Sequence, residues 1–157
     1  MATINATIAI NSGDLTSNSI SINNTMTMLK AGTCHGLEKT SGLVRRSFTS
    51  ANHVNLVAAG AQNYGTPTAS DSGAASKIYI KNTGTSSTDY VIIGLGNASD
   101  GGTITASNVD GTHVNIGRLY GGDWMLIPAH MKATVGDITI QPSTAEATTV
   151  EYMLFFE

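Results

Sequence analysis

The stretch at residues 77–81 reads Lys77-Ile78-Tyr79-Ile80-Lys81, in which two isoleucines alternate with lysine and tyrosine. Successive side chains of a β-strand point to opposite faces, so this alternation predicts a strand with one buried face. A second apolar stretch, Tyr90-Val91-Ile92-Ile93, follows within residues 89–95. Between the two lies Asn82-Thr83-Gly84, whose residue types favour a tight reversal of the chain. The centre of the sequence therefore predicts two strands joined by a turn.

The same period of two recurs toward both ends of the chain. In residues 2–10, Ile4, Ile8 and Ile10 fall on one face of a predicted strand. Turn sequences such as Gly121-Gly122-Asp123 separate the later segments at intervals of roughly 8 to 15 residues, which is typical of a sandwich or barrel. Eight to ten short strands are expected, the further ones at residues 17–23, 25–30, 54–58, 114–119, 124–127, 134–140 and 148–156.

Two segments depart from the alternation. Residues 35–46 are compatible with a short helix interrupted by Gly36 and Gly42, or with an ordered loop. Residues 60–76 form a long connection rich in Gly, Ala, Ser and Thr, which we expect to be ordered. With no internal repeat, residues 1–157 are predicted to form a single β-sandwich domain with an N-terminal strand or arm at residues 2–10.

Composition excludes several classes of function. Charged residues make up 12% of the 157 residues, about half the usual share. Only eight Lys and Arg are present and the net charge is −3, which disfavours nucleic-acid binding. No apolar run approaches the roughly 20 residues of a membrane-spanning helix, and the N-terminus lacks a secretory signal. A surface of hydroxyls and amides with few charges suits a crowded protein lattice, or a fibre or shell exposed outside a cell.

Short motifs that resemble catalytic or cofactor sites have simpler interpretations. His113 near Asp110 lacks the further ligands that a metal site needs. Adjacent residues of an extended segment point apart, so Cys34-His35 is not expected to form a dyad. Residues 94–99 begin like a dinucleotide fingerprint but end in Ser99, so their glycines are expected to shape a strand end or bulge. We therefore predict no catalytic, metal or cofactor-binding residue and no enzymatic activity, although four acids near turns leave a hydrolase open: Asp100, Asp110, Asp123 and Asp137.

Large apolar side chains point to contacts between subunits. Trp124 lies in the apolar run 123–128, which favours a core or interface position over a sugar-stacking patch. In residues 152–156 the side chains on both faces of the predicted strand are apolar. This is expected of a strand that is covered on one face by its own core and on the other by a neighbouring subunit. The predicted interface residues are Ile4, Ile8, Tyr120, Trp124, Met125, Phe155 and Phe156.

The order of segments in residues 76–157 resembles that of a known family. It runs Ile78-Tyr79-Ile80-Lys81-Asn82, Tyr90-Val91-Ile92-Ile93-Gly94, Ile116-Gly117-Arg118-Leu119, Gly121-Gly122-Asp123-Trp124-Met125-Leu126-Ile127-Pro128, Ile138-Thr139-Ile140 and Val150-Glu151-Tyr152. This is similar to small virion structural proteins of tailed bacteriophages, particularly marine and cyanobacterial phages. The resemblance implies a jelly-roll-like antiparallel β-sandwich that assembles symmetrically on a virion.

The expected function follows from that resemblance. It implies a capsid decoration or cement protein that stabilises the head shell as a homotrimer and contacts the major capsid protein or another virion protein. The virion, assembled in the host cytoplasm, would be its location. A structural protein of the tail, collar or fibre is the first alternative, and a glycan-binding module for host attachment is the second. In each structural role, residues 2–10 are a candidate added strand on a neighbouring subunit.

Overall fold

The computed structural model describes residues 3–13, 20–29, 39–49, 53–57, 75–96, 113–129, 137–144 and 147–156. All regular structure in these ranges is β-strand and every paired strand is antiparallel, which confirms the predicted all-β class. The chain divides into two compact units, Met1–Glu38 and Lys39–Glu157. The long connection predicted at residues 60–76 lies outside the described residues except for its last two, which begin a strand.

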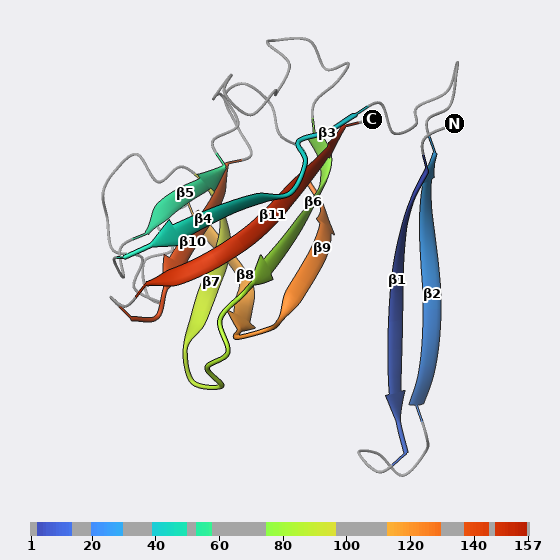
Figure 1. The fold of residues 1–157 in the computed structure, drawn as a ribbon, viewed down its shortest axis with the longest axis horizontal. Helices are drawn as coiled ribbons and strands as arrows, with labels where there is room; N and C mark the ends of the chain where they lie inside the picture. Colours follow the sequence, from blue (N-terminus) through green and yellow to red (C-terminus); the bar gives the residue numbers. More distant parts are fainter. Residues whose placement is uncertain are drawn as a thin grey trace. The chain divides into compact units, whose positions relative to one another are not determined.

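The first unit is a two-stranded hairpin of β1 (Thr3–Ser12) and β2 (Ile20–Leu29) (Figure 1). Its ten residue pairs run from Thr3 opposite Leu29 to Ser12 opposite Ile20 with no shift in register. The sequence predicted a break between residues 23 and 25, and this was wrong. Asn23 and Asn24 continue the ladder because each has a partner in β1.

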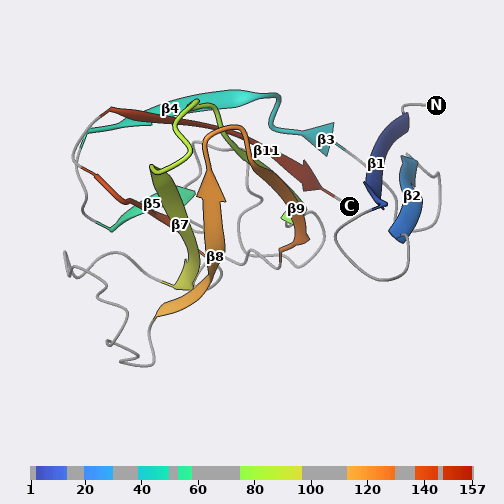
Figure 2. The ribbon, with the colours of Figure 1, turned by 90° about the horizontal axis from the view of Figure 1, so that it is seen from below.

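The second unit contains two sheets (Figures 1 and 2). In the five-stranded sheet the order is β3-β11-β6-β9, and β4 also pairs with β11 on the edge that β3 uses. In the four-stranded sheet the order is β5-β10-β7-β8. The strands are β3 (Lys39–Thr40), β4 (Val44–Phe48), β5 (Val54–Val57), β6 (Ala75–Asn82), β7 (Tyr90–Gly96), β8 (His113–Tyr120), β9 (Trp124–Pro128), β10 (Ile138–Pro142) and β11 (Thr148–Phe156).

Chain order and sheet membership are related in a simple way. The pairs β4 and β5, β6 and β7, β8 and β9, and β10 and β11 are each consecutive in the chain, and the two members of each pair lie in opposite sheets. Each of these connections therefore crosses from one sheet to the other. Most neighbouring strands within a sheet therefore come from segments far apart in the sequence. One example is β4, which pairs with β11.

The core lies between the two sheets. Ile78 and Ile80 of β6 are fully buried, as the alternation of residues 77–81 predicted, and Tyr79 between them is only half-buried. The four-stranded sheet likewise contributes fully buried aliphatic side chains, such as Ile93 and Ile140. The largest apolar side chains that this core buries almost completely are Tyr152, Phe156, Leu56, Ile78, Ile80, Ile93, Ile138, Ile140, Leu154, Val57 and Val91.

The helix considered for residues 35–46 is wrong for its described part. Residues 39–40 form β3 and residues 44–48 form β4, both paired with β11. Gly42 between them has φ of +73°, a left-handed conformation that glycine adopts without steric cost and that interrupts a right-handed helix. From Val44 to Phe48 the exposure alternates, so the local period is two. Pairing with β11 therefore decides the structure here.

Candidate assembly surfaces

The hairpin has one apolar and one polar face. Directly opposite residues of an antiparallel pair share a face, so the register places Ile10 beside Ile22 and Ala6 beside Met26. Ile4 and Ile8 lie on this same face because they are separated from Ile10 by even numbers of residues. We call the surface of Ile4, Ala6, Ile8, Ile10, Ile22 and Met26 the apolar hairpin face. The same face also carries two polar residues, Asn24 opposite Ile8 and Ser12 at its end.

The opposite face of the hairpin carries hydroxyl and amide side chains. Thr7 and Thr25 are opposite each other, and their hydroxyl oxygens are hydrogen bonded at 2.9 Å. The Ser21 hydroxyl donates to the Asn11 amide oxygen at 2.9 Å. These cross-strand bonds satisfy polar groups within the hairpin and suit a face turned to water. One face of the hairpin is thus mainly apolar and the other mainly polar.

Several side chains of the apolar hairpin face are exposed. Ile8, Ile10 and Ile22 are 45%, 51% and 48% exposed, and Met26 is also exposed. Ile4 is half-buried. An isolated two-stranded hairpin is marginally stable in water and usually needs its apolar face covered. Ile4 and Ile8, predicted as interface residues, therefore belong to a face suited to that role, and the sequence analysis overlooked Ile22 and Met26 as members of it.

A second surface is the outer face of the five-stranded sheet. Trp124 of β9 is 46% exposed and lies opposite Lys81 of β6, so its side chain points away from the core. Its ring centroid lies 6.2 Å from that of Tyr79, with the planes tilted by 37°. Tyr79 is in turn opposite Leu126 and Met153. Trp124 is thus an exposed aromatic residue and not a core residue, with Tyr79 as a partner that the sequence analysis did not identify.

An ion pair lies on the same outer face. Arg45 of β4 is opposite Glu151 of β11, and its Nε donates to the Glu151 carboxylate at 2.6 Å. The arginine is largely exposed, whereas Glu151 is buried. Burial first, and the negative charge of Glu151 second, raise the pKa of Tyr79 above its ordinary value. Tyr79 therefore lies near the ion pair of Arg45 and Glu151.

Tyr120 lies on the other sheet. It is opposite Tyr90, with ring centroids 5.4 Å apart in an edge-to-face arrangement, and Arg118 stacks over the Tyr90 ring at 4.6 Å. Tyr120 and Trp124 flank one tight turn, in which the Asp123 carboxylate accepts from the Tyr120 N–H at 2.9 Å. Tyr120 and Trp124 are close in sequence, but each contacts a different aromatic residue on a different sheet. Tyr120 contacts Tyr90, and Trp124 contacts Tyr79.

The remaining predicted interface residues are less exposed. Met125 is half-buried and packs against the core. Phe156 is 1% exposed and belongs to the core, while Phe155 is buried outside the main cluster. Both faces of residues 152–156 are thus largely covered within the single chain. A partner subunit would find little free surface on either phenylalanine.

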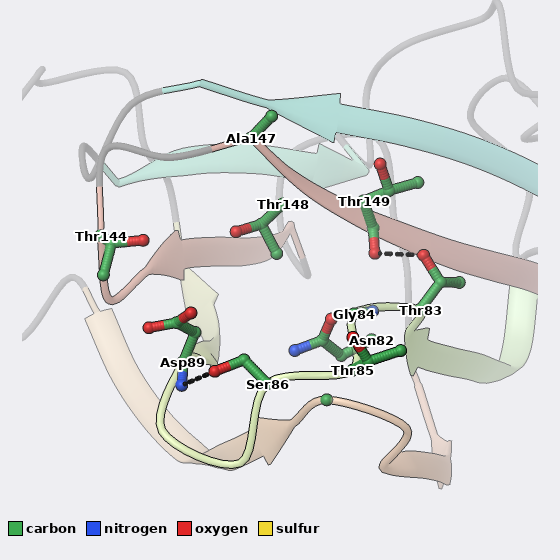
Figure 3. Close-up of a pocket in the computed structure, with 11 residues that line it drawn as sticks. Asn82, Thr83, Gly84, Thr85, Ser86, Asp89, Thr144, Ala147, Thr148 and Thr149 are labelled. Carbon is green, nitrogen blue, oxygen red and sulfur yellow. Dashed lines mark hydrogen bonds between the residues drawn. The ribbon is translucent and has the colours of Figure 1, made fainter.

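A polar pocket of about 310 Å³ lies where the β6–β7, β8–β9 and β10–β11 connections meet (Figure 3). Thr83 donates its hydroxyl to the Thr149 carbonyl at 2.8 Å, and the Asp89 N–H donates to the Ser86 hydroxyl at 3.0 Å. Asn82, which is buried, donates to the Leu119 carbonyl at 3.1 Å and so links β6 to β8. The pocket walls offer hydroxyl groups and one carboxylate, that of Asp89.

Only some of the residues of the catalytic and cofactor motifs lie in the described part of the chain. In the described ranges no group of three or more His, Cys, Asp and Glu could hold a metal ion. Asp123 binds a backbone N–H, and Asp137 accepts from Asn55 at 3.1 Å. Gly94 follows a register shift and lies close to Thr139, and β7 ends at Gly96, which confirms the bulge and strand-end interpretation. Cys34-His35, Asp100 and Asp110 lie outside the described residues.

The fold and these surfaces define an antiparallel β-sandwich preceded in the chain by an amphipathic β-hairpin. Comparison with protein-family models, with curated proteins and with solved structures finds no match to any of them. The described part of the chain holds no helix long and apolar enough to cross a membrane.

Proposed function

We propose that this protein is a non-enzymatic structural protein that acts by being packed into a larger assembly. The observation that carries the proposal is the apolar hairpin face, with Ile8, Ile10 and Ile22 each about half exposed. Burial of apolar area stabilises an assembly by roughly 25 cal/mol per Å² before entropy and polar costs are counted. A chain with such a face has a reason to bind another protein surface.

Within this class, the protein is a capsid decoration or cement protein that braces the head shell as a homotrimer. The sequence resemblance of residues 76–157 supports this role. The strand order also supports it, because the orders β4-β11-β6-β9 and β5-β10-β7-β8 are those expected of a jelly roll. Double-sheet jelly rolls recur in viral capsid domains. The partners are other copies of the chain and the major capsid protein or another virion protein.

The test combines a mass with a position. Native mass spectrometry of the purified protein is expected to give three times the chain mass. Gold labelling of intact particles is expected to mark the whole shell. Label confined to one vertex would favour the tail, collar or fibre role, and a monomer that binds no particle would contradict the structural class altogether.

A glycan-binding module for host attachment is the second candidate. The exposed Trp124 beside Tyr79 favours it, because sugar rings stack on exposed aromatic side chains. Jelly-roll architecture also occurs in lectin domains. Glycan-array binding that is lost in Trp124→Ala and retained in Tyr120→Ala would support this role. Absence of binding by the intact protein on the same array would count against it.

A further inference from the structure

We propose that the outer face of the five-stranded sheet binds an acidic oligosaccharide, with a sugar ring stacked on Trp124 beside Tyr79 and an anionic group of the glycan paired with Lys81. The inference rests on the glycan-binding candidate and names the class of glycan that it would take. Trp124 lies directly opposite Lys81, and its ring centroid is 6.2 Å from that of Tyr79. The aromatic pair and a positive charge are therefore neighbours on one surface.

Strand β6 holds this surface in place. In its stretch Lys77-Ile78-Tyr79-Ile80-Lys81, both isoleucines are fully buried in the core. Successive side chains of a strand alternate between faces, so the two lysines and the tyrosine lie on the outer face. The strand pairs with β11 along one edge and with β9 along the other. A site on such an interior strand is already ordered, so little conformational freedom is lost when a ligand binds.

One row of residues crosses the sheet through Lys81. The row consists of Arg45, Glu151, Lys81 and Trp124, which lie opposite one another in turn on β4, β11, β6 and β9. Its acid, Glu151, accepts from the Arg45 Nε at 2.6 Å, so the negative charge is balanced within the protein. In the described part of the chain, Lys81 forms no ion pair. Lys81 is therefore the side chain of the row whose charge an anionic ligand can neutralise.

The formal charge of this face is opposite in sign to that of the whole chain. Among its described residues, the face carries three cationic side chains, Arg45, Lys77 and Lys81, and one acidic side chain, Glu151, which gives +2. The complete chain of 157 residues has a net charge of −3. A positive patch on an acidic protein attracts an anionic ligand and orients it toward the patch. Charge complementarity therefore favours an acidic glycan over a neutral one.

The arrangement of the row matches a glycan better than a protein surface. The centre of a protein interface is usually depleted of charged residues, whereas Glu151 and Lys81 occupy the middle of this row. The exposed side chains are at its two ends, where Trp124 is 46% exposed and the Arg45 side chain 71%. Four strands spaced at about 4.8 Å place these ends about 14 Å apart. A ligand that reaches both ends is therefore an oligosaccharide and not a single sugar.

Pairs of polymers that differ in charge test the proposal on the full chain. Dextran sulfate is compared with dextran, and alginate with its neutral propylene glycol ester, by biolayer interferometry. The wild type should bind at least one acidic polymer about tenfold or more tightly than its neutral counterpart. This binding should weaken as the salt concentration rises, because salt screens exposed charges. The acidic polymer that binds more tightly identifies the anionic group as a sulfate or a carboxylate.

Three variants locate the binding on the sheet. Lys81→Gln should weaken binding to the acidic polymer about fivefold, because an exposed ion pair contributes modestly. Trp124→Ala should weaken it about tenfold, because the stacking surface is lost. Arg118→Gln is the matched control, since Arg118 is exposed on the four-stranded sheet and its loss removes the same charge from another surface. This control should bind as the wild type does, and circular dichroism establishes that all three variants are folded.

Failure of this inference can be separated from failure of the proposed functions. Equal binding of acidic and neutral polymers would retain the glycan-binding candidate and overturn the acidic ligand. Binding that Lys81→Gln leaves unchanged, or that Arg118→Gln weakens as much, would overturn the assigned face. Absence of binding to both acidic polymers would also overturn the inference, and the glycan array would then decide the glycan-binding candidate separately.

A protein contact at the same face has its own signature. If no polymer binds but Trp124→Ala and Lys81→Gln no longer sediment with particles, the face contacts a virion protein. That result would overturn the inference and support the structural role. Sedimentation and polymer binding use the same variants, so the two outcomes are distinguished within one set of proteins.

Discussion

Ile10 lies directly opposite Ile22 in the N-terminal hairpin, and both side chains remain about half exposed in the single chain. Directly opposed β-branched residues stabilise a hairpin by packing against each other. That cross-strand contact covers only part of each side chain. The remaining apolar area is the most direct structural reason to expect that the protein functions as part of an assembly.

Removal of residues 1–29 should separate stability from assembly. The described core is built from residues 48–156, so the free energy of unfolding of the sandwich should change by no more than about 0.5 kcal/mol. Oligomer mass and incorporation into particles should both fall. Urea unfolding and particle sedimentation provide the two measurements. A truncated protein that decorates particles fully would show that the hairpin is dispensable.

Two isoleucines in the two units should respond differently to truncation. Ile80 is fully buried, so Ile80→Ala should lower the free energy of unfolding by about 2 to 5 kcal/mol through lost burial and a cavity. Ile8→Ala should change the stability of the monomer by about 0.5 kcal/mol or less, because Ile8 is exposed. Chemical denaturation at low protein concentration compares them. Equal losses would contradict the assignment of Ile80 to the core.

The turn between β8 and β9 depends on a glycine. A Cβ at Gly121 would lie 2.6 Å from the Ser86 carbonyl oxygen and 2.7 Å from its nitrogen, both backbone atoms. Gly121→Ala should therefore cost about 1 to 3 kcal/mol of stability. Gly117→Ala is the matched control, since a Cβ there meets nothing within 4 Å. Thermal unfolding of both variants decides whether this close approach exists.

The ionisation of Tyr79 should report on Glu151. Burial and the Glu151 charge raise the pKa of Tyr79 above its ordinary value of 10.0. Glu151→Gln should lower that pKa without restoring the ordinary value, because burial, the larger cause, remains. Ultraviolet absorbance of the phenolate, with Tyr79→Phe as the reference, follows the titration. A Tyr79 pKa that rises or stays constant in the variant would contradict the assigned proximity.

The same shift predicts a pH dependence of stability. The folded-state pKa of Tyr79 is above the unfolded value, so its contribution is fully present below pH 10 or so and is lost as pH rises through the folded pKa. In Glu151→Gln the loss should be smaller, because the two pKa values are closer together. Urea unfolding at a series of alkaline pH values measures this difference. Identical profiles would contradict it.

Local patterns were sufficient to predict most strands and part of the assembly surface. Ile78 and Ile80 alternate with Lys77, Tyr79 and Lys81, and a side chain's face in a strand depends only on its neighbours in sequence. The same reasoning placed Ile4 and Ile8 on one face. It failed for residues 44–46, which belong to the segment 35–46 predicted as a short helix interrupted by Gly36 and Gly42, or as an ordered loop. That segment is a strand because β11 offers it a free edge, which is a long-range contact.

Which exposed residues meet one another depended on the folded chain. Trp124 and Tyr120 are four residues apart, yet they pair with Tyr79 and Tyr90 on different sheets because the turn between them crosses from one sheet to the other. Phe156 resembles an interface residue in sequence but fills the core. The alternating pattern of a strand shows which side chains are apolar and which of the two strand faces each one occupies. Register and sheet order, set by pairing between distant segments, decide what covers it.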